Sequence, residues 1–347
     1  MDADTWREAR ARLTAERPEL GEAAGAHYPG VARVEGTPLL ARPEWVPGEP
    51  LPLEDLRVGW DDRPAPPAVA DPPEGLPPGY RTYAAAMAGL ARPRVFEDRP
   101  SYRLLDADLA NGTGGTRGAR GTLSFGPARY FDGVNVGEAV AHELAAGTPG
   151  LPLRRRIGDP CDLARRPALL AITTLTVTES GTYVLHWRDP EKVAHAGGLH
   201  QVMPVGVFQP LEGGRGDLDP WRCVVREFHE ELLGGAEDYP PGFDQEAWPF
   251  HRDLTAARRD GRVRVRCLGL GVDPLTLAVD LLAVAVFEDA AFGEFFGGLV
   301  AENAEGRVRT AAFDGTVPAP MQPAGAAALR LAWRHRRVLG ITPGRAP

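Results

Sequence analysis

Three glutamates, Glu227, Glu230 and Glu231, lie within five residues of one another in a segment with helical periodicity. Spacing of three and four residues places their carboxylates on one face of a helix. Like charges at this spacing repel one another by about 0.2–0.5 kcal/mol per pair. A divalent cation reverses that repulsion, because Mg²⁺ takes carboxylate oxygens as ligands and keeps other positions for water and substrate phosphates. The glutamates therefore predict a Mg²⁺ or Mn²⁺ site, and the simpler alternative is a solvent-exposed acidic face.

The segment that carries these glutamates has marked ends. Asp219 is a good N-cap residue, Pro220 is tolerated at the first helical position, and Gly234 can take the left-handed conformation that ends a helix. The pattern predicts one helix over residues 220–233. Its apolar side is predicted to be buried and consists of Trp221, Val225, Phe228 and Leu232.

The run Arg226-Glu227-Phe228-His229-Glu230-Glu231 resembles the Arg-Glu-apolar-x-Glu-Glu core of the Nudix box. Two predicted strands precede it in the order found in that family, at 183–188 and at 203–208. The second of these strands occupies the place of the family's Pro-Gly-Gly strand.

The flanks of the box depart from the family pattern. The departures are Leu218 in place of Glu, Glu212 in place of Gly, Val205 in place of a Pro-Gly-Gly glycine, and a closing glycine shifted from Leu233 to Gly234. Asp217 and Asp219 flank the missing glutamate and are candidates to replace it. An altered diphosphate-binding loop is expected from these changes.

The resemblance implies metal-dependent hydrolysis of a nucleoside diphosphate linked to another moiety. It assigns Glu227, Glu230 and Glu231 as metal ligands and catalytic groups, and Arg226 as the box arginine that tethers a neighbouring glutamate. A carboxylate from a later loop is an alternative for assisting the attacking water. Two other functions stay open: a ligand-binding or regulatory protein that has lost turnover on a Nudix scaffold, and a biosynthetic enzyme that uses the fold for other chemistry.

Substrate contacts are predicted from the loop between the two strands that precede the box. This loop spans residues 189–200 and contributes Lys192, His195 and His200, with Arg188 at the end of the first strand. Loops carry binding residues more often than scaffold elements do. These four side chains are candidates for contacts with a substrate phosphate or base, and the alternative is a merely polar loop.

The chain length of 347 residues suits two domains. We expect an α/β (α+β) fold, in which residues 1–165 form a smaller mixed domain of unknown role and residues 166–347 form a Nudix-like mixed sheet sandwiched by helices. Predicted helices lie at 4–15, 80–90, 135–144 (capped by Asn135) and 323–339. Predicted strands lie at 56–60, 102–108, 121–126, 171–177, 262–272 and 275–287.

Composition limits the partners and the compartment. The net charge of −8 argues against a nucleic-acid partner, because phosphate-backbone affinity requires clustered cations. No apolar run of 18 residues exists, so no membrane span and no secretory signal are predicted. The cysteines, Cys161, Cys223 and Cys267, are few and widely spaced, which fits a reducing cytoplasm. The expected partner is a small-molecule diphosphate or nucleotide-like ligand, and a homodimer is left open.

Overall fold

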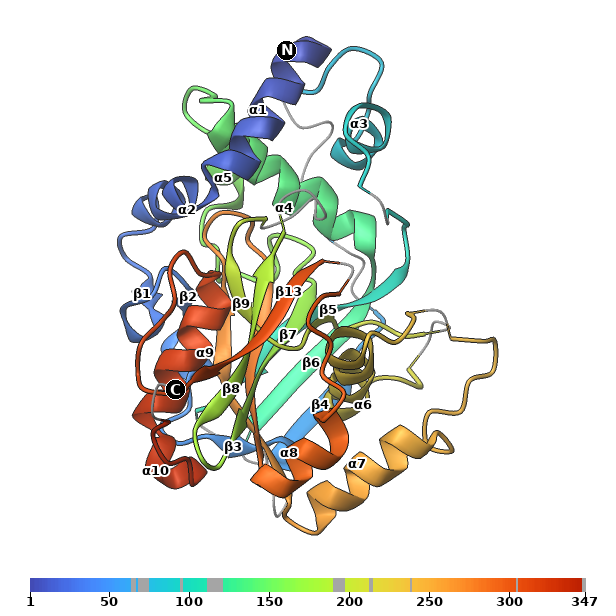
Figure 1. The fold of residues 1–347 in the computed structure, drawn as a ribbon. Coiled ribbons are helices and arrows are strands. Elements are labelled where there is room, and N and C mark those ends of the chain that lie inside the picture. The colour runs from blue at the N-terminus through green and yellow to red at the C-terminus, as the bar shows by residue number, and fades with distance from the viewer. Residues whose placement is uncertain are drawn as a thin grey trace.

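The computed structural model describes residues 1–63, 67, 75–93, 96–110, 121–189, 197–211, 215–237, 239–303 and 305–344. The fold of these residues is mixed α/β, as predicted (Figure 1). Their α-helices are α1 (Ala3–Ala15), α2 (Arg17–Ala26), α3 (Tyr83–Leu90), α4 (Tyr130–Ala145), α5 (Pro152–Ile157), α6 (Pro220–Glu227), α7 (Pro249–Arg259), α8 (Asp289–Phe296), α9 (Pro323–Arg334) and α10 (Arg336–Leu339). Their strands are β1 (Ala32–Arg33), β2 (Leu40–Ala41), β3 (Leu51–Pro52), β4 (Leu56–Trp60), β5 (Pro100–Asp108), β6 (Gly121–Arg129), β7 (Leu170–Thr178), β8 (Thr182–Arg188), β9 (His200–Val202), β10 (Val205–Val207), β11 (Val263–Val272), β12 (Val279–Phe287) and β13 (Gly306–Ala312).

A large mixed sheet has the strand order β1-β2-β11-β12-β7-β8-β13. β12 lies at its centre, parallel to β7 and antiparallel to β11. Every residue of β12 is buried, which explains why its sequence is apolar almost without interruption. In Figure 1, β7 and β8 run between α9 on the left and α6 on the right.

The segment before β12 is a turn and not the strand predicted from residue 275. The Asp273 carboxylate accepts hydrogen bonds from the Leu275 backbone N–H and from the Thr276 hydroxyl. Leu277 then takes a positive φ of 58°. The prediction failed here because an apolar run does not distinguish a buried turn from a buried strand.

A smaller sheet has the order β4-β6-β5, with β4 parallel to β6. Helix α4 follows β6 directly and begins five residues before the predicted cap at Asn135. The Asp132 carboxylate accepts a hydrogen bond from the Arg129 N–H at 2.8 Å, which starts the helix there. Asn135 lies inside the helix, and its side chain accepts from the Ala84 N–H of α3.

Residues from the first half of the chain also extend the large sheet. β2 and β3 each pair with β11, and one core cluster contains side chains from Trp6 to Ile341. The division of the chain at residue 165 stays a prediction. None of the helices in the described ranges is long and apolar enough to cross a membrane.

Candidate functional site

Helix α6 begins as the sequence predicts. The Asp219 carboxylate accepts from the Trp221 N–H at 2.8 Å, and Pro220 occupies the first turn. The four predicted apolar residues are all buried: Trp221, Val225, Phe228 and Leu232 are at most 5% exposed. Gly234 has a φ of 71°, the left-handed conformation expected at the end of the helix.

The middle of this segment departs from the predicted single α-helix. α6 ends at Glu227, and residues Phe228–Leu232 form a π-helical turn, η4. Hydrogen bonds from i to i+5 widen the turn, so the side chains that follow Glu227 do not keep α-helical spacing. π-Turns of this kind occur frequently at functional sites.

Glu227 lies against the backbone of Gly206 in β10. A Cβ atom on Gly206 would lie 1.9 Å from Oε1 of Glu227, so only glycine leaves room for this carboxylate. The Glu227 side chain forms no hydrogen bond or ion pair with any residue of the described ranges. Burial raises the pKa of Glu227 well above its usual range, and the charges of Glu230 and Glu231 raise it further.

The other two carboxylates each accept one hydrogen bond from the protein. The Tyr239 hydroxyl donates to Oε1 of Glu230 at 2.7 Å, and the Val205 N–H donates to Oε2 of Glu231 at 3.0 Å. Burial is the largest cause that raises the pKa of both groups. For Glu231 the next cause is the negative charge of Glu305.

The chemistry of this donor set fits a hard divalent cation, because it offers oxygen ligands whose negative charges are poorly compensated. The geometry is less complete. Among the described residues, no group of three or more His, Cys, Asp or Glu side chains is arranged to hold a metal ion. The described residues therefore do not show the three glutamates arranged around one cation in the way that the sequence predicts.

Arg226 is buried and does not bind any of the three glutamates. Its guanidinium donates to the Gln245 side chain at 3.0 Å and to the Gln209 carbonyl at 3.1 Å, and lies 3.6 Å from the Asp217 carboxylate. Asp217, which precedes Leu218, thus faces Arg226. Asp219, the other candidate, serves as the helix cap.

Replacing Arg226 by Met is expected to lower the free energy of unfolding by about 3 kcal/mol, because it leaves buried polar partners unpaired. Urea denaturation measures this change. Arg222→Met is the matched control on the same helix, since the Arg222 side chain is 20% exposed against 4% for Arg226. The control should cost less than about 1 kcal/mol. Equal losses in the two variants would contradict an anchoring role for Arg226.

The structure places only some of the predicted substrate-binding residues near the candidate site. Arg188 pairs with Glu305 at 2.6 Å, and both charges act on Glu231, so this guanidinium lies beside the candidate site. The His200 backbone pairs with Trp187 of β8 and with residues 320–322: the backbone N–H donates to the Pro320 carbonyl, and the backbone carbonyl accepts from the Gln322 N–H. Lys192 and His195, like Glu212, lie outside the described residues.

Tyr239, Glu305 and Gly206 are components of the site that the sequence did not identify as such. Tyr239 is held in a group of rings, 4.7 Å from Phe243 and 6.2 Å from Trp248 between centroids. Glu305 lies in the loop before β13, far along the chain. Gly206 carries the clearest signal, since it follows Pro204 in the strand that resembles the family's Pro-Gly-Gly strand.

No protein-family model and no curated protein matches the chain. The similarity to the Nudix family therefore rests on residues 226–231 and on the strands that precede them.

Proposed function

We propose that the protein is a hydrolase that depends on Mg²⁺ or Mn²⁺ and cleaves a small molecule with a diphosphate linkage, such as a nucleoside diphosphate conjugate. The observation that carries this proposal is the electrostatic state of Glu227, Glu230 and Glu231. All three are half-buried and have raised pKa values, and Glu227 has no partner among the described side chains. Perturbed carboxylates of this kind are concentrated at functional sites.

The existing hydrogen bonds leave ligand positions available. A carboxylate has two oxygens, and Tyr239 and Val205 each occupy only one oxygen of Glu230 and Glu231. When bound, the cation would neutralise phosphate charge and lower the pKa of a bound water. The residues that would hold it are Glu227, Glu230 and Glu231, after side-chain movement that directs the three carboxylates to one point.

The remaining parts of the site fit a small anionic substrate. Arg188 supplies a guanidinium beside Glu231, and guanidinium groups bind phosphate oxygens in a fixed fork. The chain carries a net charge of −8, which disfavours a nucleic-acid partner. We also propose a cytoplasmic location, supported by three free, buried cysteines. A homodimer stays open.

A ligand-binding protein without turnover is the second candidate. It is favoured by the hydrogen bonds that Glu230 and Glu231 accept from Tyr239 and Val205, since these contacts stabilise the carboxylates without a cation. Such a protein would bind the same class of diphosphate and leave it intact.

The two candidates are separated by incubating the protein with a panel of nucleoside diphosphate conjugates and Mg²⁺, and by measuring released phosphate products. Saturable, Mg²⁺-dependent product release supports the hydrolase. A rise in melting temperature with one of the compounds, without any product, supports the binding protein. If no compound of the panel is cleaved and none raises the melting temperature, both candidate functions are contradicted.

Removing the Tyr239 hydroxyl is expected to shift the pH dependence of cation binding. This hydroxyl donates to Glu230 and lowers its pKa, so Tyr239→Phe raises that pKa further. A cation binds the ionised carboxylate, and the midpoint of Mn²⁺ binding should therefore move to higher pH. Calorimetric titration at several pH values measures the midpoint. Tyr130→Phe is the control, because the Tyr130 hydroxyl forms no hydrogen bond within the described part of the chain; equal midpoints in both variants would contradict the role of Tyr239.

A further inference from the structure

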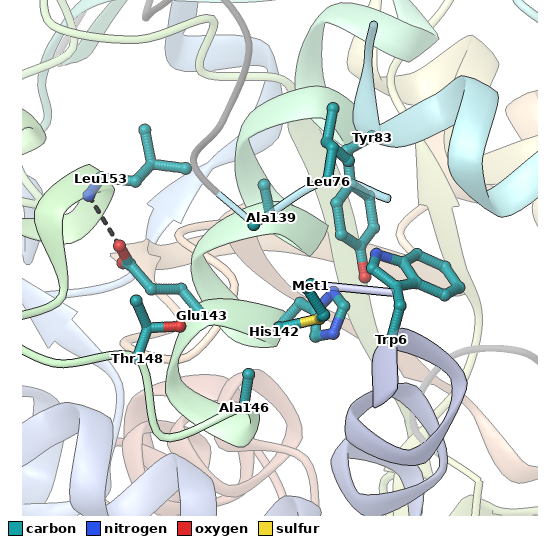
Figure 2. A pocket seen from close by; sticks show the side chains of 11 residues that line it. Met1, Trp6, Leu76, Tyr83, Ala139, His142, Glu143, Ala146, Thr148 and Leu153 are labelled. Carbon is teal, nitrogen blue, oxygen red and sulfur yellow. Dashed lines mark hydrogen bonds between the residues drawn. The ribbon is translucent and has the colours of Figure 1, made fainter. Parts of the chain in front are cut away.

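A small cavity lies between α1, α3 and α4, in the first half of the chain. Its wall includes Met1, Trp6, Leu76, Tyr83, His142 and Leu153, and its volume is about 20 Å³. Figure 2 shows the Trp6, Tyr83 and His142 side chains gathered on one side of this space. A cavity of this volume is large enough for one water molecule.

Two buried polar atoms at this cavity, Nε1 of Trp6 and Nε2 of His142, have no hydrogen-bond partner within the described part of the chain. The Tyr83 hydroxyl lies beside them and interacts with the Arg10 guanidinium. The three side chains are 0%, 2% and 4% exposed. Their rings contact one another, with centroids 4.9 Å apart for Trp6 and His142 and 5.4 Å apart for Tyr83 and His142. Buried polar groups without partners are uncommon, and two of them beside one cavity indicate that a hydrogen-bonding molecule occupies it.

The charged neighbours of the cavity are already paired. Oxygens of the Glu143 carboxylate accept from the Leu153 and Arg154 N–H groups, and the first of these bonds is visible in Figure 2. Arg10 pairs with Glu138. Burial lowers the pKa of His142 to about 4, so its ring is neutral at pH 7. The unsatisfied atoms are therefore both neutral, and a charged ligand would lose its hydration without compensation.

The hydrogen-bonding character of Trp6 and His142, with the Tyr83 hydroxyl beside them, indicates which ligand fits. The Trp6 indole can only donate, the Tyr83 hydroxyl can donate or accept, and a neutral imidazole nitrogen without a proton can only accept. A hydroxyl group is the smallest group that accepts from the indole and donates to the imidazole at once. Apolar side chains such as Leu76 and Leu153 complete the wall and suit a short aliphatic part.

We infer that this cavity is a binding site for one small neutral hydroxyl compound, held by Trp6, Tyr83 and His142. The hydroxyl group can belong to a water molecule or to a short alcohol. This site is far in sequence from the box glutamates and stands whether or not the protein cleaves diphosphates.

NMR of the full-length ¹⁵N-labelled protein tests this site, with the Trp6 indole N–H resonance assigned through Trp6→Phe. A cross-peak from this N–H to water, with the sign of a long-lived contact, identifies water as the occupant. ¹³C-methanol is then added. If the cross-peak to water is replaced by a cross-peak from the Trp6 indole N–H to the methanol methyl group, the cavity binds a short alcohol. Absence of both cross-peaks would overturn the inference.

A variant that fills the cavity provides the second measurement. Ala139 lines the cavity, and Ala139→Leu should abolish the cross-peak at the Trp6 indole. Ala88→Leu on the exposed side of α3 is the control and should keep it. A cross-peak that survives in Ala139→Leu would place the contact outside this cavity. If Ala139→Leu does not fold, the measurement on the parent protein still decides the inference.

Discussion

Replacing Glu231 or Glu230 by Gln is expected to lower diphosphate turnover by about 10²–10³-fold, the cost of losing one interaction that stabilises the transition state. Each substitution keeps the size of the side chain and removes one negative charge from the cation site. Steady-state assays at saturating Mg²⁺ measure the effect. Glu246→Gln is the control, because that carboxylate is 73% exposed and pairs only with Arg222 among the described residues. Unchanged turnover in both site variants would show that hydrolysis takes place elsewhere.

The same variants should be at least as stable as the parent when no cation is present. A carboxyl group whose folded pKa lies above its unfolded value stabilises the fold at low pH. That contribution is lost as the pH rises from the unfolded value through the raised folded value. Glu231 belongs to this class, since burial and the charge of Glu305 raise its pKa. At pH 7 the Gln variants should therefore unfold at a temperature equal to or higher than that of the parent. A clear fall in melting temperature would contradict mutual repulsion among the buried carboxylates.

Replacing Gly206 by Ala is expected to displace the Glu227 carboxylate and so to weaken cation binding. The Cβ of Gly206→Ala would lie 1.9 Å from Oε1 of Glu227, and the carboxylate must move away. The backbone of Gly206 does not have a positive φ, so alanine itself is not strained there. Turnover and Mn²⁺ affinity should each fall by about 10²-fold, because the displaced carboxylate no longer reaches the cation.

A double-mutant cycle shows whether this loss acts through Glu227. If it does, Gly206→Ala adds little to Glu227→Gln, because both changes remove the same ligand. Gly216→Ala is the control, since a Cβ at that position meets no atom within 4 Å. Additive losses from Gly206→Ala and Glu227→Gln would mean that Gly206 serves another purpose.

The sequence predicted those features of the site that depend on local periodicity and on capping. The buried face of α6, the Asp219 cap and the left-handed Gly234 all follow from residue types within one helix. The π-turn could not be predicted in this way. It is supported by distant contacts, among them the Val300 N–H that donates to the Leu232 carbonyl and the edge contact between His229 and Trp248.

The contacts around the three glutamates could not be predicted from local sequence patterns either. Arg188 and Glu305 form an ion pair although 117 positions separate them in the chain. The Tyr239 hydroxyl reaches Glu230 from a loop whose sequence carries no periodic signal. Such contacts depend on how loops cross the sheet, which hydrophobic spacing does not encode.

Titration with Mn²⁺, monitored by the electron paramagnetic resonance signal of the free ion, tests the cation site most directly. The parent protein should bind Mn²⁺ saturably, and the triple variant Glu227→Gln, Glu230→Gln, Glu231→Gln should lose this binding while remaining folded. Equal Mn²⁺ binding by the parent and the triple variant, or a parent that leaves all Mn²⁺ free, would contradict a divalent-cation centre at the box glutamates.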